Sequence, residues 1–425
     1  MAELLVIADD FTGALDTGVQ FTTVNASTRV VTDRDFDFSM LDSSVQVLVM
    51  DSETRHLDAD TAYSNIRNIA DRAFRSGIRH IYKKTDSALR GNLGAELAAL
   101  LDASGESILS FIPAFPKMNR ITRDGIHYID GTIVSDSVFG KDPFEPVCSG
   151  NIAELIRKDR LVRTANTNVA EGERVINDRS EPEILIWDAE TDEDLENIAE
   201  ILKNSSKTKI IAGCAGFAAF LPEIIGFSGT MDNAYCMKDS FLAICGTQNP
   251  MTIRQMDKAE MEGFKRIRLS PKEKFEKGFW DSKEGKKKLN DLAGIIEKEQ
   301  KLIIDCNDPP GTDEARKYKE ENHIGSEDER IRVSGACGLI LEGLSEKDLK
   351  FIALITGGDT LIGCMEHLGI NELRPIAEIA PGTVLSGFMH DGQEQMIMSK
   401  SGGFGDERLL IFLSELAAGN IPVRE

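Results

Sequence analysis

Short apolar runs alternate with charged, periodic segments along the first half of the chain. These segments predict helices at 60–76 and 92–102, and the apolar runs predict buried strands at 4–8, 29–32, 45–50, 80–83 and 108–113. Such alternation is typical of a mostly parallel sheet covered by helices. A hairpin centred on Asp130-Gly131 is predicted at 126–134, and further strands at 183–187 and 209–212.

The alternation of predicted strands and helices resumes beyond a turn-rich stretch at 226–230, which we interpret as a linker. Later segments predict helical structure at 283–299 and 313–344, and strands at 241–245, 266–269, 302–306 and 351–356. A hairpin turning at Asp391-Gly392 is predicted between 384–390 and 395–399. Because 425 residues exceed one ordinary core, we expect two α/β domains, 1–228 and 229–425. Each is expected to be a mostly parallel sheet flanked by helices, with a cleft between the domains.

The composition excludes several classes of protein. The formal net charge is −22, whereas nucleic acids and anionic membranes are bound by basic faces, so neither is expected as a partner. No apolar run approaches the roughly 20 residues that span a bilayer, and no basic region of a signal peptide opens the chain. The seven cysteines form no C-x-x-C pair, which argues against a zinc ribbon or a disulfide framework and favours the cytoplasm.

Two adjacent carboxylates, Asp9 and Asp10, end the first predicted strand and precede Thr12-Gly13. Ligands of open parallel sheets bind beyond the carboxyl ends of the strands. The pair could therefore orient a hydroxyl, bind Mg²⁺ or act as a base. The alternative is that Asp10 or Thr12 only caps the next helix, a role worth about 0.5–2 kcal/mol. One cap would account for one aspartate and not for both.

A second polar cluster follows the predicted strand at 80–83 and contains Lys84, Asp86, Ser87 and Arg90. In so acidic a chain, this local positive charge suggests a small acidic ligand, because arginine and lysine pair with carboxylates. Ordinary surface salt bridging is the alternative.

The segment after 108–113 carries two prolines and then Arg120, Thr122 and Arg123. The prolines stop the strand, so we expect the three polar residues in a loop that could close over a ligand. A plain surface loop is the alternative. His127 lies beside them, and a lone histidine in a hairpin is more often structural.

Glycine-rich turns end three predicted strands of the second half. They contain Gly246-Thr247, Gly357-Gly358-Asp359-Thr360 and Gly402-Gly403. Such turns let backbone N–H groups approach a phosphate, and a helix N-terminus favours the anion. Each could be a plain tight turn, but three in one domain favour a nucleotide pocket. No Walker loop, G-x-x-x-x-G-K-[ST], occurs in the chain.

The motifs follow one another in a recognisable order: IADDFTGALDTG, KKTDSALRGNLGAEL, PAFPKMNRITRDGIHYIDG, AGCAGFA, GGDT and SGGFG. In this order, and over essentially the whole chain, the sequence resembles the four-carbon acid sugar kinases, which include the D-threonate and D-erythronate kinases. The resemblance implies an N-terminal domain that binds the acid sugar and a C-terminal domain that binds ATP. It also implies transfer of the γ-phosphoryl to the terminal C4 hydroxyl.

Residue by residue, the resemblance implies that Asp9, Asp10, Lys84, Asp86, Ser87 and Arg90 lie on the side of the substrate. We add Arg120 to these substrate-binding residues. The resemblance implies an ATP side of Thr247, Gly357, Gly358, Asp359, Thr360, Gly402 and Gly403. Two departures stand out. Ala88 replaces a threonine that members often have, and Asn249 lacks the hydroxyl of the common Gly-Ser-x-Ser-like loop.

On this basis Arg90 and Lys84 are expected to hold the substrate carboxylate. Asp10 or Asp86 would be catalytic by orienting the attacking hydroxyl, and Asp9 would help position a Mg²⁺–phosphate group. ATP and Mg²⁺ are the expected cofactors, and no metal ligand is assigned. Two alternatives remain: a non-catalytic two-lobed sensor of acidic metabolites, and a Mg²⁺-dependent phosphatase or lyase. The sugar-acid stereoisomer and the oligomeric state stay open, a homodimer being one arrangement considered.

Overall fold

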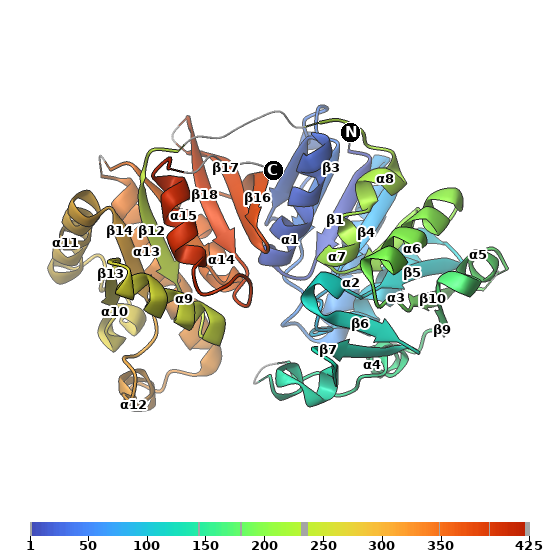
Figure 1. Cartoon of the computed structure of the whole chain (residues 1–425), viewed down its shortest axis with the longest axis horizontal. Helices are drawn as coiled ribbons and strands as arrows, with labels where there is room; N and C mark the ends of the chain where they lie inside the picture. The colour runs from blue at the N-terminus through green and yellow to red at the C-terminus, as the bar shows by residue number, and fades with distance from the viewer. Residues whose placement is uncertain are drawn as a thin grey trace. The chain divides into compact units, whose positions relative to one another are not determined.

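The computed structural model describes residues 2–142, 145–178, 181–230, 237–347, 349–390 and 392–420. It divides the chain into two compact units, Met1–Met231 and Asp232–Glu425. Figure 1 labels their helices and strands along the chain from blue to red. No described helix is both long enough and apolar enough to cross a membrane.

The main sheet of the first unit is parallel throughout, in the order β2-β3-β1-β4-β11-β5-β10-β9. Its strands are β1 Leu4–Ala8, β2 Thr28–Val31, β3 Val47–Asp51, β4 His80–Lys84, β5 Ile108–Ile112, β9 Thr164–Thr167, β10 Glu183–Trp187 and β11 Ile210–Gly213. The strands predicted here are confirmed with small shifts at their ends. β9 was not predicted, because its sequence TANT has no apolar run.

Helices connect these strands: α1 Phe11–Gly18, α2 Ala59–Ser76, α3 Leu93–Ser104, α4 Ile152–Asp159, α5 Val169–Asn177, α6 Asp192–Asn204, α7 Ala215–Ala218 and α8 Leu221–Ile225. Strands such as β1, with the sequence LLVIA, are buried at every position, as expected for a sheet covered on both faces. Leu4, Leu5 and Ile7 are among the fully buried side chains. The parallel arrangement places the carboxyl ends of all these strands at one edge.

A small antiparallel sheet accompanies the main one and contains β6 Arg120–Arg123, β7 Ile126–Ile129 and β8 Thr132–Ile133. The predicted β7–β8 hairpin is confirmed. The prediction that Arg120, Thr122 and Arg123 lie in a loop is wrong, because they form β6 and pair with β7. The turn between β6 and β7 places Asp124 and Gly125 at φ 52° and 70°, the left-handed pair that a tight hairpin requires.

The second unit has the strand order β13-β14-β12-β15-β18-β17-β16, in which the pairs from β13 to β18 are parallel and the last two are antiparallel. The strands are β12 Ser240–Cys245, β13 Lys265–Arg268, β14 Lys301–Asp305, β15 Phe351–Thr356, β16 Glu372–Ala380, β17 Thr383–His390 and β18 Gln393–Lys400. The predicted β17–β18 hairpin is confirmed, although Asp391 of its predicted turn lies outside the described residues. β16 was not predicted.

Helices α9 Pro250–Met261, α10 Pro271–Phe275, α11 Lys283–Glu299, α12 Glu314–Glu321, α13 Ser326–Ser345, α14 Gly358–His367 and α15 Leu409–Ala417 complete the second unit. The segment predicted as largely helical at 313–344 forms two helices, α12 and α13. Between them His323 adopts φ 53°, a left-handed conformation that ends a helix.

Candidate functional site

The carboxyl ends of three neighbouring strands lie level at one edge of the first unit's sheet. Ala8 at the end of β1 pairs in register with Asp51 of β3 and with Lys84 of β4. The residues that follow these ends therefore meet, although they are far apart in the sequence. They include the predicted site residues Asp9, Asp10 and Asp86.

Asp10 caps the next helix, as one of the two interpretations expected, and it also pairs with an arginine. Its Oδ1 accepts the N–H of Gly13 at 2.9 Å and so caps α1. Its Oδ2 accepts the Thr12 hydroxyl at 3.1 Å and Arg55 Nη1 at 2.7 Å. Burial raises the pKa of Asp10, but Arg55 and Lys84 outweigh burial and hold that pKa below its ordinary value. Asp10 is thus an ionised cap inside a charged cluster.

Asp9 is almost fully buried and shares the same arginine. Its Oδ2 accepts Arg55 Nε at 2.9 Å and lies 2.8 Å from Nη2. Its Oδ1 is buried without a hydrogen-bond partner. A buried carboxylate oxygen is costly to leave unpaired, so a donor from a ligand or a water would stabilise it.

Arg55 is the site residue that sequence reasoning missed. It follows β3 in the stretch Ser52-Glu53-Thr54-Arg55, and its guanidinium also approaches Asp86 at 3.8 Å. Three carboxylates surround it, and its side chain is only 9 % exposed. The strand-end rule that selected Asp9 and Lys84 would have selected this stretch as well, had it been applied to the predicted strand at 45–50.

Asp86 and Arg90 form a tight pair within the loop after β4. Arg90 Nε donates to Asp86 Oδ2 at 2.9 Å and Nη2 donates to Oδ1 at 3.1 Å, the two-pronged geometry of arginine with a carboxylate. Burial raises the pKa of Asp86, but Arg90 and Arg55 hold it well below its ordinary value. Arg90 Nη1 also lies 3.4 Å from Asp142 Oδ2. Existing ion pairs thus already use much of the Arg90 guanidinium.

Lys84 differs from every other cation of this cluster. Its side chain is largely buried, with 5 % of the residue exposed. Among the described residues its ammonium forms no hydrogen bond and no ion pair. A Cβ placed on Gly13 would lie 2.6 Å from Lys84 Nζ, so the glycine leaves the space that this ammonium fills. An ammonium at the end of a largely buried side chain gains from an anionic partner, and an acidic ligand would supply one.

Arg120 and His127 of the small sheet contact the cluster through Ser87, which lies in the loop after β4. Arg120 donates a hydrogen bond to the Ser87 hydroxyl. His127 Nε2 lies 3.0 Å from the Ser87 carbonyl, and its Nδ1 lies 3.1 Å from the Thr122 hydroxyl. Burial lowers the pKa of His127 to about 4, so the ring is neutral at pH 7 and fixes the loop, as its structural interpretation expected. Arg123, by contrast, pairs with Glu190 at an exposed position outside the cluster.

An aromatic ring lies close to two arginines of this cluster. The guanidinium carbons of Arg90 and Arg120 lie 5.3 Å and 5.4 Å from the centre of the Phe139 ring. Both distances are within the range of cation–π attraction. Phe139 and Asp142 belong to the segment after β8, which therefore fixes Arg90 from a second direction.

The glycine-rich turns of the second unit also converge. A Cβ on Gly246 would lie 2.0 Å from Thr360 Oγ1, and one on Gly402 would lie 3.2 Å from Thr247 Oγ1. Gly357 adopts φ 97° as the N-cap of α14, close to Thr247. The backbones of these turns can approach one another only because these positions lack side chains. The result is a glycine-rich cradle at the N-terminus of α14, which suits a phosphate group.

Charged groups border this cradle. Lys400 is fully buried and donates to Thr252 Oγ1 at 3.1 Å and to the Gly402 carbonyl at 3.0 Å. Burial lowers the pKa of Lys400 to about 8. Asp359, in the first turn of α14, pairs with Arg330 at 2.6 Å. Gly403 lies near Asn249, because a Cβ there would be 3.6 Å from Asn249 Nδ2.

Carboxylates that could hold Mg²⁺ in the first unit are Asp9, Asp10 and Asp86, since Mg²⁺ prefers oxygen ligands. All three already pair with arginine guanidinium groups. Within the described part of the chain, no group of three histidine, cysteine or acidic side chains is placed to hold a metal ion. The donor set therefore fits a polar organic ligand better than an ion held by protein side chains alone.

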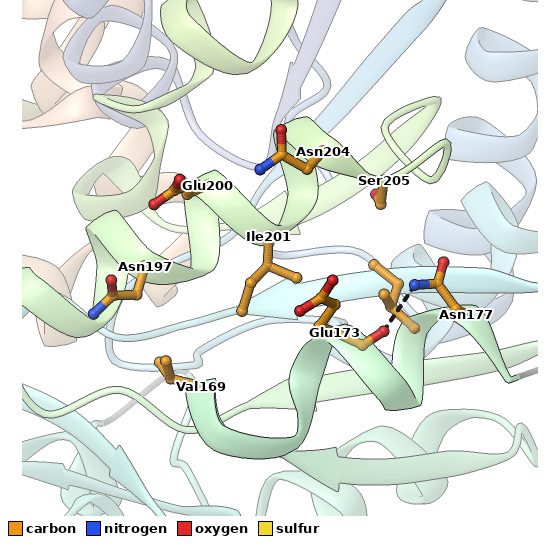
Figure 2. A pocket seen from close by; sticks show the side chains of 9 residues that line it. Val169, Glu173, Asn177, Asn197, Glu200, Ile201, Asn204 and Ser205 are labelled. Carbon is orange, nitrogen blue, oxygen red and sulfur yellow. Dashed lines mark hydrogen bonds between the residues drawn. The ribbon is translucent and has the colours of Figure 1, made fainter.

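A cavity of about 300 Å³ lies elsewhere in the first unit, between α5 and α6. Figure 2 shows Glu173 and Asn177 of α5 opposite Glu200 and Ile201 of α6. None of the residues predicted for the site lines this cavity.

Comparisons with known proteins match two separate stretches of the chain to two described domains. Residues 4–221 match the family described as a sugar-binding N-terminal domain, and residues 242–410 match a nucleotide-binding C-terminal domain. A D-threonate kinase of Salmonella typhimurium is 25 % identical over 98 % of this chain and 100 % of its own length. A D-erythronate kinase of Heliobacterium modesticaldum is 27 % identical over 47 % of this chain and 48 % of its own.

Solved structures share the fold. One is a Salmonella typhimurium protein described as a putative tRNA synthase, with a TM-score of 0.79 and 20 % identity over 97 % of this chain and 98 % of its own. Another, from Haemophilus influenzae, has a TM-score of 0.71 and 19 % identity over 97 % of this chain and 100 % of its own.

Proposed function

The chain belongs to the family that joins a sugar-binding N-terminal domain to a nucleotide-binding C-terminal domain, the four-carbon acid sugar kinases, and on this premise we propose its reaction. The γ-phosphoryl of ATP passes to the terminal C4 hydroxyl of a four-carbon sugar acid such as D-threonate or D-erythronate. The products are the 4-phospho sugar acid and ADP. In this proposal residues 1–228 bind the sugar acid and residues 229–425 bind the nucleotide.

The Lys84 ammonium is the feature that carries the proposal. It has no hydrogen-bond or ion-pair partner among the described residues, and Asp10 is close enough for Lys84 to lower its pKa. A sugar acid offers one carboxylate and several hydroxyls, which match one unpaired cation beside several carboxylates. We assign the substrate carboxylate first to Lys84. Arg90 contributes less to binding the substrate carboxylate, because its guanidinium already pairs with Asp86 and Asp142.

The attacking hydroxyl is assigned to Asp10 or Asp86. Both have a lowered pKa, so both are ionised at neutral pH and accept a hydrogen bond from a hydroxyl. Phosphoryl transfer asks the protein mainly to position groups and neutralise charge. A carboxylate of low basicity suits this task, since it can orient the nucleophile and accept its proton late.

On the nucleotide side, the cradle formed by Thr247, Gly357, Gly358, Thr360, Gly402 and Gly403 is assigned to the phosphates. Asp359 lies in the same turn, and its pairing with Arg330 places a cation beside it. Mg²⁺, when bound, supplies charge neutralisation to the phosphates. It is proposed to enter with the nucleotide, because the carboxylates of the first unit are paired with arginines.

A screen for ADP formation tests the proposal. The purified chain is given ATP, Mg²⁺ and one sugar acid at a time: D-threonate, D-erythronate, their L-forms and 3-oxo-tetronate, which several relatives are named for. We expect ADP release with one or two of these acids and none without an acid. Stabilisation by a sugar acid without ADP formation in any mixture would favour a sensor and contradict the proposal. A cytoplasmic location belongs to the same proposal.

A further inference from the structure

Four buried polar side chains lie beneath the substrate cluster: Ser52, Thr54, Lys83 and Glu96. We call them the polar brace. Ser52, Thr54 and Lys83 are 0 % exposed and Glu96 is 2 % exposed. Lys83 Nζ lies 3.0 Å from Glu96 Oε2. Glu96 Oε1 accepts the Thr54 hydroxyl, which lies 2.9 Å from the Ser52 hydroxyl.

The polar brace reaches all three strand exits that carry the cluster. Ser52 Oγ donates to the Ala8 carbonyl at 2.6 Å, immediately before Asp9. Lys83 Nζ donates to the Lys84 carbonyl at 2.9 Å. Thr54, held by Glu96, immediately precedes Arg55. One carboxylate from α3 therefore pairs with Thr54 and Lys83 beside the backbones that present Arg55 and Lys84, and Thr54 in turn contacts Ser52 beside the backbone that presents Asp9.

Stability alone does not account for this arrangement. Removing a lysine and a glutamate from water costs several kcal/mol per ion, and well-packed apolar residues of similar size are often as stabilising or more so. A polar network differs from an apolar core in its directionality, because each hydrogen bond fixes a distance and an angle. Glu53, inside the braced segment, adopts φ 46°, a conformation that needs support from its surroundings.

We propose that Glu96 is a positioning residue, which through Lys83, Thr54 and Ser52 holds the exits of β1, β3 and β4 in the register that aligns Asp9, Arg55 and Lys84. Glu96 acts through these neighbours and does not itself contact the substrate. The geometric part of the inference stands without the proposed reaction, and only its kinetic consequence rests on that reaction.

Hydrogen–deuterium exchange tests the geometric part on the full chain. Three variants are compared with the wild type: Glu96→Gln, Lys83→Met/Glu96→Leu, and the control Lys203→Met/Glu223→Leu, which removes an exposed pair of the same unit. In the first two variants we expect exchange to rise about tenfold in peptides covering 8–13, 51–57 and 84–92. The control should exchange like the wild type. Faster exchange confined to α3, or to only one of the three peptides, would overturn the inference.

The apolar pair separates positioning from stability. Lys83→Met/Glu96→Leu should keep the wild-type midpoint of urea unfolding or come close to it. Its kcat/KM for the sugar acid should fall on the order of 10²-fold, while the KM for ATP stays unchanged. Wild-type kcat/KM in this variant would overturn the inference. If the wild type phosphorylates no sugar acid, the proposed function fails, and the exchange measurement still decides whether Glu96 positions the three exits.

Discussion

The guanidinium of Arg55 lies 2.7 Å from a carboxylate oxygen of Asp10. The residue that caps α1 is therefore also held by an arginine from the exit of β3. The same arginine binds Asp9 and approaches Asp86. Because both carboxylates pair with one guanidinium, its positive charge offsets the repulsion between the two adjacent aspartates at the strand end.

Replacing Arg55 tests how much the cluster depends on it. Arg55→Met would leave Asp9 buried without a cation, and breaking a buried ion pair from one side costs about 3–5 kcal/mol. We expect a loss of this size in the free energy of unfolding of the first unit, measured with urea. Arg123→Met, at an exposed pair with Glu190, is the control and should cost less than about 1 kcal/mol. Equal losses in the two variants would contradict the central place given to Arg55.

Replacing Lys84 tests the assignment of the substrate carboxylate. A hydrogen bond to a charged group contributes about 1.5–3 kcal/mol, so Lys84→Met should raise the KM for the sugar acid about tenfold to a hundredfold. The KM for ATP should stay constant. Lys203→Met, an exposed lysine of the same unit, serves as control. An unchanged KM for the sugar acid would remove Lys84 from the binding site.

Asp10→Asn separates capping from chemistry. Asparagine caps a helix about as well as aspartate, so the capping of α1 should survive. We expect kcat to fall by about 10²-fold or more if the carboxylate orients the nucleophile. Asp58→Asn makes the same change at the cap of α2 and should leave kcat intact. Near wild-type turnover in a folded Asp10→Asn variant would exclude Asp10 from the reaction.

His127 should make the stability of the first unit depend on pH. Burial lowers its pKa from 6.5 to about 4, so between these values the unfolded chain binds a proton that the folded chain does not. The free energy of unfolding should therefore fall as the pH drops from 6.5 to 4, by on the order of 3 kcal/mol in total.

Urea unfolding at several pH values checks this dependence. His127→Gln should flatten the slope between pH 6.5 and 4, whereas His323→Gln, at an exposed position of the other unit, should not. The aspartates of lowered pKa act at lower pH, because the stability they contribute is lost only as the pH falls through their folded values. An unchanged slope in His127→Gln would contradict the assignment.

Gly246→Ala tests the glycine-rich cradle of the second unit. The added Cβ would lie 2.0 Å from Thr360 Oγ1, which must move and disturb the turn at Gly357. We expect the KM for ATP to rise about tenfold or more, with the KM for the sugar acid unchanged. Gly294→Ala is the control, because a Cβ there meets no atom within 4 Å. An unchanged KM for ATP in Gly246→Ala would separate this turn from the nucleotide.

The periodic pattern of apolar residues was enough to predict most of the fold. Strands such as β1 and β10 are buried at every position, and buried strands read as continuous apolar runs. β9 was not predicted, because its sequence, TANT, is mostly polar. Arg120 was placed in a loop because two prolines precede it. The dipeptide Asp124-Gly125, which is the same turn signal that predicted the other hairpins, was not used, and it joins β6 to β7.

Part of the charged cluster was predicted from the positions at which the apolar runs end. Asp9 and Lys84 follow apolar runs directly, so the strand-end rule selects them from the sequence. Arg55 lies further beyond β3, in a stretch that the same rule selects when it is applied to that strand. Its contacts with Asp9 and Asp10 depend on the register between β1 and β3, which no local pattern reveals. The burial of Lys84 was also unexpected, since lysine is rarely buried unless it is paired.

In the proposed reaction, this chain phosphorylates a four-carbon sugar acid at its terminal hydroxyl. The most direct measurement is phosphorus–proton correlation NMR on the product formed from D-threonate or D-erythronate with ATP. We expect a single phosphomonoester whose phosphorus couples to the two C4 protons. Phosphate on another carbon, or inorganic phosphate as the only new species, would contradict it.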